Sequence, residues 1–325
     1  MKRLIFSMFF AVMAVVAVNA QQIAVVSGSG ATSVYQTLAK AIEEADPGST
    51  IYLPGGGFQI SDDVKITKRL NIIGIGHKAV SENADGNTVI SGNLFFNEKS
   101  DGSAVMGCYI SGNINVGNDG SSVNNILIKY CNLNAVEVNN NSCTGTEVSH
   151  NYVRSSSTFH NSSVKFNNNV AYSLGGLQGG TIENNIFTGS YGNGILTSVS
   201  NSTISNNVFI HWNSYGGYLY NSSDFFAFGN MTNKYRLGDA PVFLENVDWN
   251  NVFVDYNNGA VSPASNFHFK GDYQQYEGEV GIYGGTEPFN DSALPPVPYI
   301  VSKVIPEQTD ASGKLNLKIR VKAGE

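Results

Sequence analysis

A short phrase of apolar and polar residues recurs through the middle of the chain. Fragments such as TEVSHNYV, VKFNNNVA, TIENNIFT and TISNNVFI each place an apolar residue three positions before an Asn and one or two apolar residues after it. The phrase continues through a series of Asn residues that lie 16 to 23 positions apart, namely Asn93, Asn113, Asn132, Asn151, Asn169, Asn185, Asn207, Asn230 and Asn251. Cys131, Gly229 and Asn250 fit the apolar flanks as well as their neighbours do, so the register is open by one residue there.

A period near 20 residues, built from short alternating segments, predicts a solenoid of strands. Each turn is too small to bury its own apolar face, so stacking of the turns must supply the core. Asn tolerates the left-handed backbone region and therefore suits a sharp bend between two strands. Stacked Asn side chains also hydrogen-bond to one another along the axis. We therefore expect the Asn series to be a structural ladder.

The two ends of the chain predict caps for this solenoid. Ser33 to Ala45 has helical periodicity, with a capping-box pattern at Ser33 and Gln36, and Pro47-Gly48 stops it. A helix over about residues 34–45 would hide the first coil from water. Beyond residue 278, two alternating segments at 299–305 and 315–321 predict a hairpin that covers the other end.

Two runs near the start resemble a known family. The run TLAKAIEEADPGSTIYLPGGGFQI, followed by KRLNIIGIG at residues 68–76, is similar to the beginning of pectin-lyase-like right-handed parallel β-helix proteins. With the Asn series, the resemblance covers about residues 30–260. It implies an all-β fold, a right-handed parallel β-helix with an N-terminal capping helix and a C-terminal β-hairpin cap. The tail is similar to the endings of exported β-helix proteins of the phylum Bacteroidetes.

The first 20 residues have the pattern of a signal peptide. Lys2 and Arg3 precede an apolar run from Leu4 to Val18, and Val18-Asn19-Ala20 is a cleavage pattern. We expect an exported protein that is secreted, periplasmic or held at the cell surface, with no integral membrane span. The predicted division is a signal peptide at 1–20, the β-helix at 21–277 and a C-terminal capping segment at 278–325.

Charge and cysteine content exclude several classes of partner. Removal of residues 1–20 leaves 17 basic and 26 acidic residues, a net charge near −9. This balance argues against nucleic acid and anionic membranes as partners. Cys108, Cys131 and Cys143 are odd in number, lack metal-ligand spacing and fall at different offsets from the ladder, so they need not stack and we expect buried free thiols. No metal site and no cofactor is predicted.

Aromatic and charged residues recur three to six positions after successive ladder Asn residues. Stacking of the coils would place them in one stripe, whose members are Arg154, Tyr172, Tyr191, His211, Trp212, Tyr235, Arg236, Asp255 and Tyr256. Flat sugar faces stack on aromatic rings, and charged groups fix hydroxyls or uronates. The stripe predicts binding of a polysaccharide or other glycan. Aromatic residues that brace a turn or fill the core are the alternative.

Motifs of the family's known enzymes are missing from this sequence. Polygalacturonases use a tight set of Asp residues that includes an adjacent pair, but the one such pair here is Asp62-Asp63 in the first coil. The Arg-x-Pro-x-x-Arg motif of pectate lyases does not occur. A lyase with an unfamiliar site would use Arg154, His211, Lys234 or Arg236 as base and Tyr235 as acid.

Three functions follow from these observations. We expect first an exported, glycan-binding or adhesive β-helix protein without a recognisable catalytic site. The alternatives are a polysaccharide lyase or glycoside hydrolase acting on an acidic polysaccharide, and a structural surface spacer.

Overall fold

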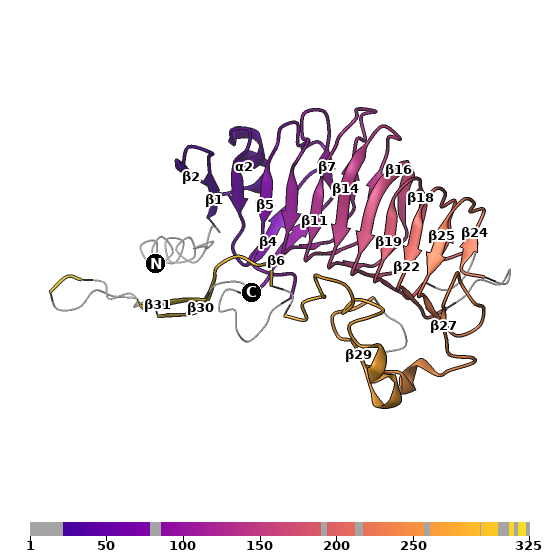
Figure 1. The fold of residues 1–325 in the computed structure, drawn as a ribbon. Helices are drawn as coiled ribbons and strands as arrows, with labels where there is room; N and C mark the ends of the chain where they lie inside the picture. The colour runs from indigo at the N-terminus through magenta and orange to yellow at the C-terminus, as the bar shows by residue number, and fades with distance from the viewer. Residues whose placement is uncertain are drawn as a thin grey trace, which may run out of the picture.

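The computed structural model describes residues 22–78, 86–189, 194–211, 217–256, 261–292, 294–304, 312–314 and 318–322. In these residues the chain forms a parallel β-helix whose coils stack along one axis (Figure 1). The predicted all-β, parallel β-helix fold is therefore confirmed. Up to three short strands form each coil, and we name the three faces that they build A, B and C in chain order.

Parallel pairing between neighbouring coils defines the three faces. Face A contains β3 (Thr50–Tyr52), β5 (Asn71–Ile73), β8 (Ala104–Met106), β11 (Leu127–Lys129), β14 (Thr144–Ser149), the second part of β16 (Ser157–Asn167), β19 (Thr181–Glu183), β22 (Thr203–Ser205) and β25 (Phe226–Phe228). Face B contains β4 (Gly56–Gln59), β6 (Thr88–Ser91), β9 (Tyr109–Ile110), β12 (Asn132–Leu133), β15 (Tyr152–Val153), β17 (Val170–Ala171), β20 (Ile186–Phe187), β23 (Val208–Phe209), β26 (Met231–Thr232) and β27 (Val242–Phe243). Face C contains β7 (Leu94–Phe96), β10 (Ile114–Val116), β13 (Val136–Val138), the first part of β16, β18 (Leu174–Leu177), β21 (Leu196–Thr197) and β24 (Leu219–Tyr220).

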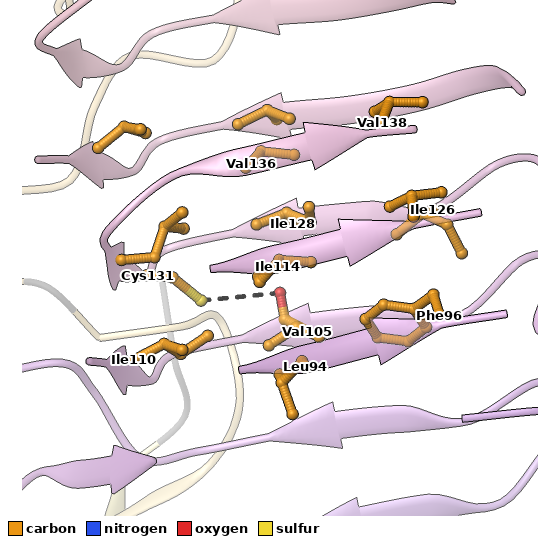
Figure 2. Packing of buried hydrophobic residues seen from close by; sticks show 14 of the residues in the cluster. Leu94, Phe96, Val105, Ile110, Ile114, Ile126, Ile128, Cys131, Val136 and Val138 are labelled. Atoms are coloured by element: carbon orange, nitrogen blue, oxygen red, sulfur yellow. Dashed lines mark hydrogen bonds between the residues drawn. The ribbon is translucent and has the colours of Figure 1, made fainter. Parts of the chain in front are cut away.

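The apolar residue that precedes each Asn points into the core, as its spacing predicts. Val148, Phe166, Ile182 and Ile204 occupy matching register positions on face A, and all four are fully buried. Figure 2 shows the same arrangement in earlier coils, where Val105 and Ile128 of face A meet Ile114 and Val136 of face C. Alternate residues of each strand thus build one continuous core.

Five ladder residues form an uninterrupted hydrogen-bonded column at the corner between faces A and B. Asn151, Asn169, Asn185, Asn207 and Asn230 are fully buried. In each of the first four, the backbone N–H and Nδ2 both donate to Oδ1 of the next Asn, at 2.9–3.1 Å. Each Nδ2 also donates to a face A carbonyl of the previous coil, as Asn185 does to Phe166 at 2.8 Å. The column therefore satisfies the polar groups of a buried corner.

The rest of the predicted ladder lies elsewhere. Cys131, not Asn132, continues the column, because its N–H donates to Asn151 Oδ1 at 2.8 Å and Asn132 belongs to β12. Cys108 precedes the β9 residue that pairs with Asn132, so Cys108 and Cys131 occupy the same column in successive coils, which their offsets from the ladder did not indicate. Asn93 and Asn113 form a separate short column, in which Asn113 N–H donates to Asn93 Oδ1 at 2.8 Å. Asn251 lies in the 3₁₀ helix η1 (Trp249–Asn251). All three cysteines are buried and free, as expected.

The left-handed residue of each bend is the one before the ladder Asn. Its φ is positive in seven consecutive coils, at Gly107, Tyr130, His150, Asn168, Asn184, Asn206 and Gly229. The ladder residues themselves do not have positive φ. The expected bend is present, but the Asn side chain that makes the ladder is not the residue that turns the chain.

The N-terminal cap is shorter than the sequence suggests. Residues 33–35 belong to strand β2 (Thr32–Tyr35), which pairs antiparallel with β1 (Ile23–Val26), so the capping box at Ser33 and Gln36 is wrong. Helix α2 (Leu38–Glu44) begins after Thr37, whose hydroxyl accepts a hydrogen bond from Lys40 N–H at 3.3 Å. Leu38, Ala41 and Ile42 are its buried residues.

After the last coil, the chain turns back along the outside of the solenoid. Face B is followed by η1, β28 (Phe253–Asp255), β29 (Asn266–Phe269) and the 3₁₀ helix η3 (Gly271–Tyr276). Residues 278–292 and 294–300, here named the C-terminal strap, then cross the coils toward the first one (Figure 1). The strap ends in β30 (Tyr299–Val304), which pairs antiparallel with β31 (Lys318–Lys322).

The strap is anchored by the left-handed residues, one coil after another. Gly281 N–H donates to Asn206 O at 2.8 Å, and Asn184 Nδ2 donates to Glu279 O at 3.1 Å. Asn168 Nδ2 donates to Ile282 O and Gly284 O, at 2.9 and 2.8 Å. Further contacts place His150 Nε2 2.8 Å from Glu287 O, Lys129 Nζ 3.0 Å from Glu287 Oε2, and Pro295 against Gly107. The strap therefore docks along the column of positive-φ residues.

The strap buries an apolar stripe on the outer side of face B. Tyr152, Val170, Ile186, Val208 and Met231 point away from the coil interior, yet each is at most 3 % exposed. Strap residues Val280, Ile282 and Phe289 complete this second core, together with Trp249 and Phe253. Face B is thus buried on both sides from β15 to β26, which explains why two apolar residues follow Asn151, Asn169, Asn185 and Asn207.

This path corrects the expected position of the hairpin. β30 and β31 do pair, but Tyr299 and Ile300 line a small cavity with Tyr52 and Leu53 of the first coil. The prediction that the hairpin covers the C-terminal end of the solenoid is wrong, because the strap carries it to the opposite end. All five residues of β31 are exposed.

A histidine ties the strap to the preceding segment. His268 Nδ1 lies 2.6 Å from Glu277 Oε1, and Nε2 lies 2.9 Å from Asp291 Oδ2. The ring stacks on Tyr283 with 3.8 Å between centroids, and the Tyr283 hydroxyl donates to Asp291 Oδ1 at 2.7 Å. Two ring nitrogens that both face carboxylates require the protonated imidazolium. Partial burial lowers the pKa of His268, but the two carboxylates outweigh it and the pKa is raised.

We expect the strap to loosen as the pH rises through the raised pKa of His268. A raised pKa in the folded state adds stability that is fully present below the ordinary histidine pKa and is lost above the raised one. Since the ring is 41 % exposed, the effect on the free energy of unfolding should be about 0.2–1 kcal/mol. Urea unfolding at about pH 6 and pH 9 measures it. His268→Gln should remove this pH dependence, and an unchanged dependence in that variant would contradict the prediction.

Candidate functional site

An open cleft of about 530 Å³ lies on face C. It crosses three consecutive coils, at β16, β18 and β21, and the turns that lead into them from face B. Its lining residues are Ser156, Ser157, Thr158, His160, Asn161, Tyr172, Ser173, Leu174, Gly175, Gly176, Gly189, Gly194, Ile195, Thr197 and Ser198. We name it the face C cleft.

The register of face C explains why the surface is hollow at this place. Glu137, Thr158, Gly175, Thr197 and Tyr220 occupy the same position on five successive strands, with outward-facing side chains alternating with buried ones. The column has a side chain on every strand except the central one. A Cβ at Gly175 would lie 3.1 Å from Thr197 O, so the floor of the cleft is backbone. A missing side chain in a continuous column leaves a depression.

The polar side chains of the cleft are mostly hydroxyls. Hydroxyls come from Ser, Thr and Tyr172, and Asn161 adds an amide. The hydroxyls of Ser156 and Ser173 lie 2.5 Å apart. His160 and Tyr172 are the titratable side chains of the described lining, which includes no Asp, Glu, Lys or Arg. Such a surface is suited to hydrogen bonding with hydroxyl-rich ligands.

Tyr172 is the member of the predicted aromatic stripe that lines the cleft. Arg154 precedes it by one coil in the same column, but its guanidinium is engaged within the protein. Nη2 donates to Ile110 O at 2.9 Å and to Ser111 O at 3.2 Å, Nη1 donates to Asn132 Oδ1, and the group lies over the Tyr109 ring. Burial lowers the pKa of Arg154. This arginine braces three coils.

Three described stripe residues, His211, Asp255 and Tyr256, do not line the cleft with Tyr172. Tyr256 is only 8 % exposed and packs in the outer core of face B, where its hydroxyl lies 3.3 Å from His211 Nε2. Burial raises the pKa of Tyr256 to about 12 and lowers that of His211. The expectation of an exposed Tyr256 is wrong, because the segment from β28 folds onto face B. Asp255 is exposed on β28.

Two further stripe residues lie on the surface near the last coil. Tyr235 is 36 % exposed, and the Arg236 guanidinium lies over the Phe243 ring at 4.4 Å. Tyr191 and Trp212 lie outside the described residues. Among the stripe residues that the structure describes, the offsets from the ladder therefore predicted one cleft residue, because the turns that follow the ladder differ in length.

Sequence reasoning missed Thr158, Gly175 and Thr197. The sequence signal that could have revealed them is the Gly175-Gly176 pair, because glycine in the interior of a strand often marks a close approach by a ligand. Aligning the strands of face C with one another would have found this pair. The ladder numbering could not reveal it, because the loop before face C differs in length between coils.

The main charged cluster on face A belongs to the strap contact. Lys129 Nζ lies 3.3 Å from Glu147 Oε1 and 3.0 Å from Glu287 Oε2. The hydrogen bond from Lys129 lowers the pKa of Glu287. Across the part of the chain that the structure describes, no group of three or more His, Cys, Asp or Glu side chains is arranged to hold a metal ion. No helix in that part is long and apolar enough to cross a membrane.

A stacked parallel β-helix with an open polar cleft on one face defines the class of this protein. The chain belongs to the rhamnogalacturonase A/epimerase, pectate lyase-like family, whose model matches residues 18–238. The match contains the face C cleft and ends before the strap. No curated protein and no solved structure matches the chain. Family membership points to a function that involves polysaccharides.

Proposed function

We propose that this protein is an exported polysaccharide-binding protein that holds a glycan in the face C cleft without cleaving it. The observation that carries the proposal is the cleft itself, open over three coils and lined by hydroxyls, an amide and Tyr172. Hydroxyls of a sugar exchange hydrogen bonds with such groups, and a sugar face packs on a tyrosine ring. An open cleft suits an extended chain, because the chain can enter and leave at both ends.

Absence of an acid and base pair in the described lining supports binding over hydrolysis. Glycoside hydrolysis generally uses two carboxyl groups on either side of the scissile bond, one with a raised pKa. The pair Glu147 and Glu287 is bridged by Lys129 on face A, and the pKa of Glu287 is lowered. That direction is opposite to the one that a general acid needs.

A polysaccharide lyase or hydrolase is the second candidate, because the matching family is described by enzymes. One experiment separates the two. Protein lacking residues 1–20 is run through native gels that contain individual polysaccharides, and the same mixtures are assayed for new reducing ends and for absorbance of unsaturated products. Retardation without cleavage supports the proposal. Cleavage supports the enzyme, and absence of both leaves the structural spacer.

Export is proposed from residues 1–20, which lie outside the described residues. The charged start and apolar run support it. Cell fractionation of the full-length chain, with N-terminal sequencing of the product, tests this part. A product that begins at Gln21 outside the cytoplasm agrees with the proposal, and a full-length cytoplasmic product contradicts it.

Tyr172→Ala should weaken polysaccharide binding about tenfold. Stacking on an aromatic ring contributes about 1–3 kcal/mol in nucleic-acid recognition, and a sugar should lie at the lower end. Tyr172 is half-buried at the edge of the cleft and is absent from both apolar cores, so the fold should persist. Native gel retardation gives the affinities, and thermal unfolding checks the fold.

Tyr52→Ala is the matched control, because Tyr52 is 43 % exposed on face A. It should leave the affinity unchanged. Equal loss in both variants, or no loss in Tyr172→Ala, would place binding elsewhere.

A further inference from the structure

The charge around the face C cleft carries information about which polysaccharides it accepts. A uronate carries one carboxylate per sugar, and a carboxylate that leaves water needs a cation or several N–H donors as compensation. The described lining residues supply hydroxyls, an amide and the His160 imidazole, but no lysine or arginine. A charged sugar would therefore lose hydration in the cleft without gaining a lysine or arginine as its ionic partner.

The arginine that is next to the cleft residues in the sequence does not supply the missing charge. Arg154 precedes Ser156 by two residues, but its guanidinium donates to the carbonyls of Ile110 and Ser111 and to Asn132. Lys165 lies on the face A part of β16, where it pairs in register with Glu147 and Thr181. Neither cation is directed into the cleft by its contacts.

The charge that does lie beside the cleft is negative. Glu137 pairs in register with Thr158, so it occupies the next strand of the same outward column, about 4.8 Å away along the axis. Its Oε1 accepts a hydrogen bond from Asn113 Nδ2 at 2.6 Å, which holds the carboxylate on this face. The net charge of −7 for the whole chain adds long-range repulsion of polyanions.

The other end of the column offers an aromatic surface. Tyr220 pairs in register with Thr197 on the adjacent strand and is 42 % exposed. Thr158, Gly175, Thr197 and Tyr220 thus follow one another along the solenoid axis. A sugar chain that lies in the hollow at Gly175 and runs along this axis meets hydroxyls first and a ring afterwards.

We infer that the face C cleft takes an uncharged stretch of polysaccharide, lying along the solenoid axis, and discriminates against uronate chains. This inference rests on the proposed function, since it names the ligand class of the same cleft. It replaces the acidic polysaccharide that the sequence alone suggests for an enzyme of this family.

Polysaccharides that differ only in charge give the sharpest test. Polygalacturonate and alginate are each compared with their carboxyl-reduced forms, which keep the backbone and linkage and lose the charge, beside neutral xylan, glucomannan and galactan. Binding is measured by native gel retardation at about pH 8, where histidines in general are neutral. We expect retardation by at least one neutral or reduced polymer, with at least tenfold weaker binding of any matching acid form.

A gain-of-function variant locates the effect. Thr158→Arg places a cation at an exposed position of the cleft, between the buried neighbours Ser157 and Phe159 that hold the strand. This variant should raise the affinity for the acid polymers about tenfold or more. Contacts between neutral polymers and Tyr220 should remain in place. Thr203→Arg adds the same charge on face A and should not change acid binding.

Each outcome has a distinct meaning. Acid forms that bind the native protein as tightly as reduced forms, or more tightly, overturn the inference while leaving polysaccharide binding intact. A second outcome also overturns the inference: the native protein binds neutral polymers, but Thr158→Arg gains no affinity for acid polymers. The discrimination against charge would then arise outside the cleft. Failure of every polymer to bind overturns the proposed function itself.

Discussion

Asn185→Ala is expected to lower the free energy of unfolding by about 2–5 kcal/mol. The side chain is fully buried, with Nδ2 donating to Phe166 O and Oδ1 accepting from Asn169 N–H. Alanine leaves both backbone groups without a partner, and each buried unsatisfied group costs about 1–3 kcal/mol. Urea unfolding followed by circular dichroism measures the change.

Asn113→Ala is the control for this prediction. Asn113 stacks on Asn93 in the outer column, and its side chain donates to Glu137, but it is half-buried and water can replace its partners. Its loss should be below about 1 kcal/mol. If both variants lost the same free energy of unfolding, the buried Asn column at the corner between faces A and B would have no special role in stability.

Ile186→Ala is expected to cost about 2–4 kcal/mol, although Ile186 points away from the coil interior. It is 1 % exposed beneath the strap, where a Cβ at Gly281 would lie 3.5 Å from its Cγ1. Truncation of a buried isoleucine generally costs about 2–5 kcal/mol, from lost burial and from the cavity left behind. The adjacent Phe187, which faces the interior, should behave in the same way when changed to alanine.

Thr181→Ala provides the comparison, because Thr181 is a half-exposed outward residue of face A that lies outside the core beneath the strap. A change within about 0.5 kcal/mol is typical of such surface positions. If Ile186→Ala were equally mild in the same urea experiment, the strap would not be packed on face B in solution.

Regular features of the molecule could be predicted from the sequence. Val148, Phe166, Ile182 and Ile204 repeat at a fixed distance from the ladder, and local alternation decides which of their neighbours point inward. The ladder from Asn151 to Asn230 follows for the same reason. These features depend on contacts between equivalent residues of neighbouring coils, which a period expresses directly.

Features that join distant parts of the chain could not be predicted in this way. The strap docks on residues far earlier in the chain, as Ile282 does on Asn168, 114 positions away. The sequence of the strap has no periodic pattern that would indicate which coil residues it contacts. The apolar residue directly after each Asn of the column was the available signal, since a solvent-facing position has no need to be apolar.

The face C cleft could be predicted from the sequence only in part. Its floor follows from the register of face C, but loops of unequal length separate the ladder from that face, so offsets counted from Asn169 or Asn207 lose the register. Arg154 shows the second difficulty. Its residue type suggests a ligand contact, whereas two carbonyl acceptors and the Tyr109 ring engage it within the protein.

A crystal structure with a bound oligosaccharide tests the central claim most directly. The fragment should come from the polymer that retards the native protein most strongly. The account predicts uncharged sugar rings over Gly175, within hydrogen-bond distance of Thr158 and Thr197 and against the Tyr172 ring, with the glycosidic bonds intact. Sugar bound on face A or beside the strap, with the face C cleft empty, would contradict it.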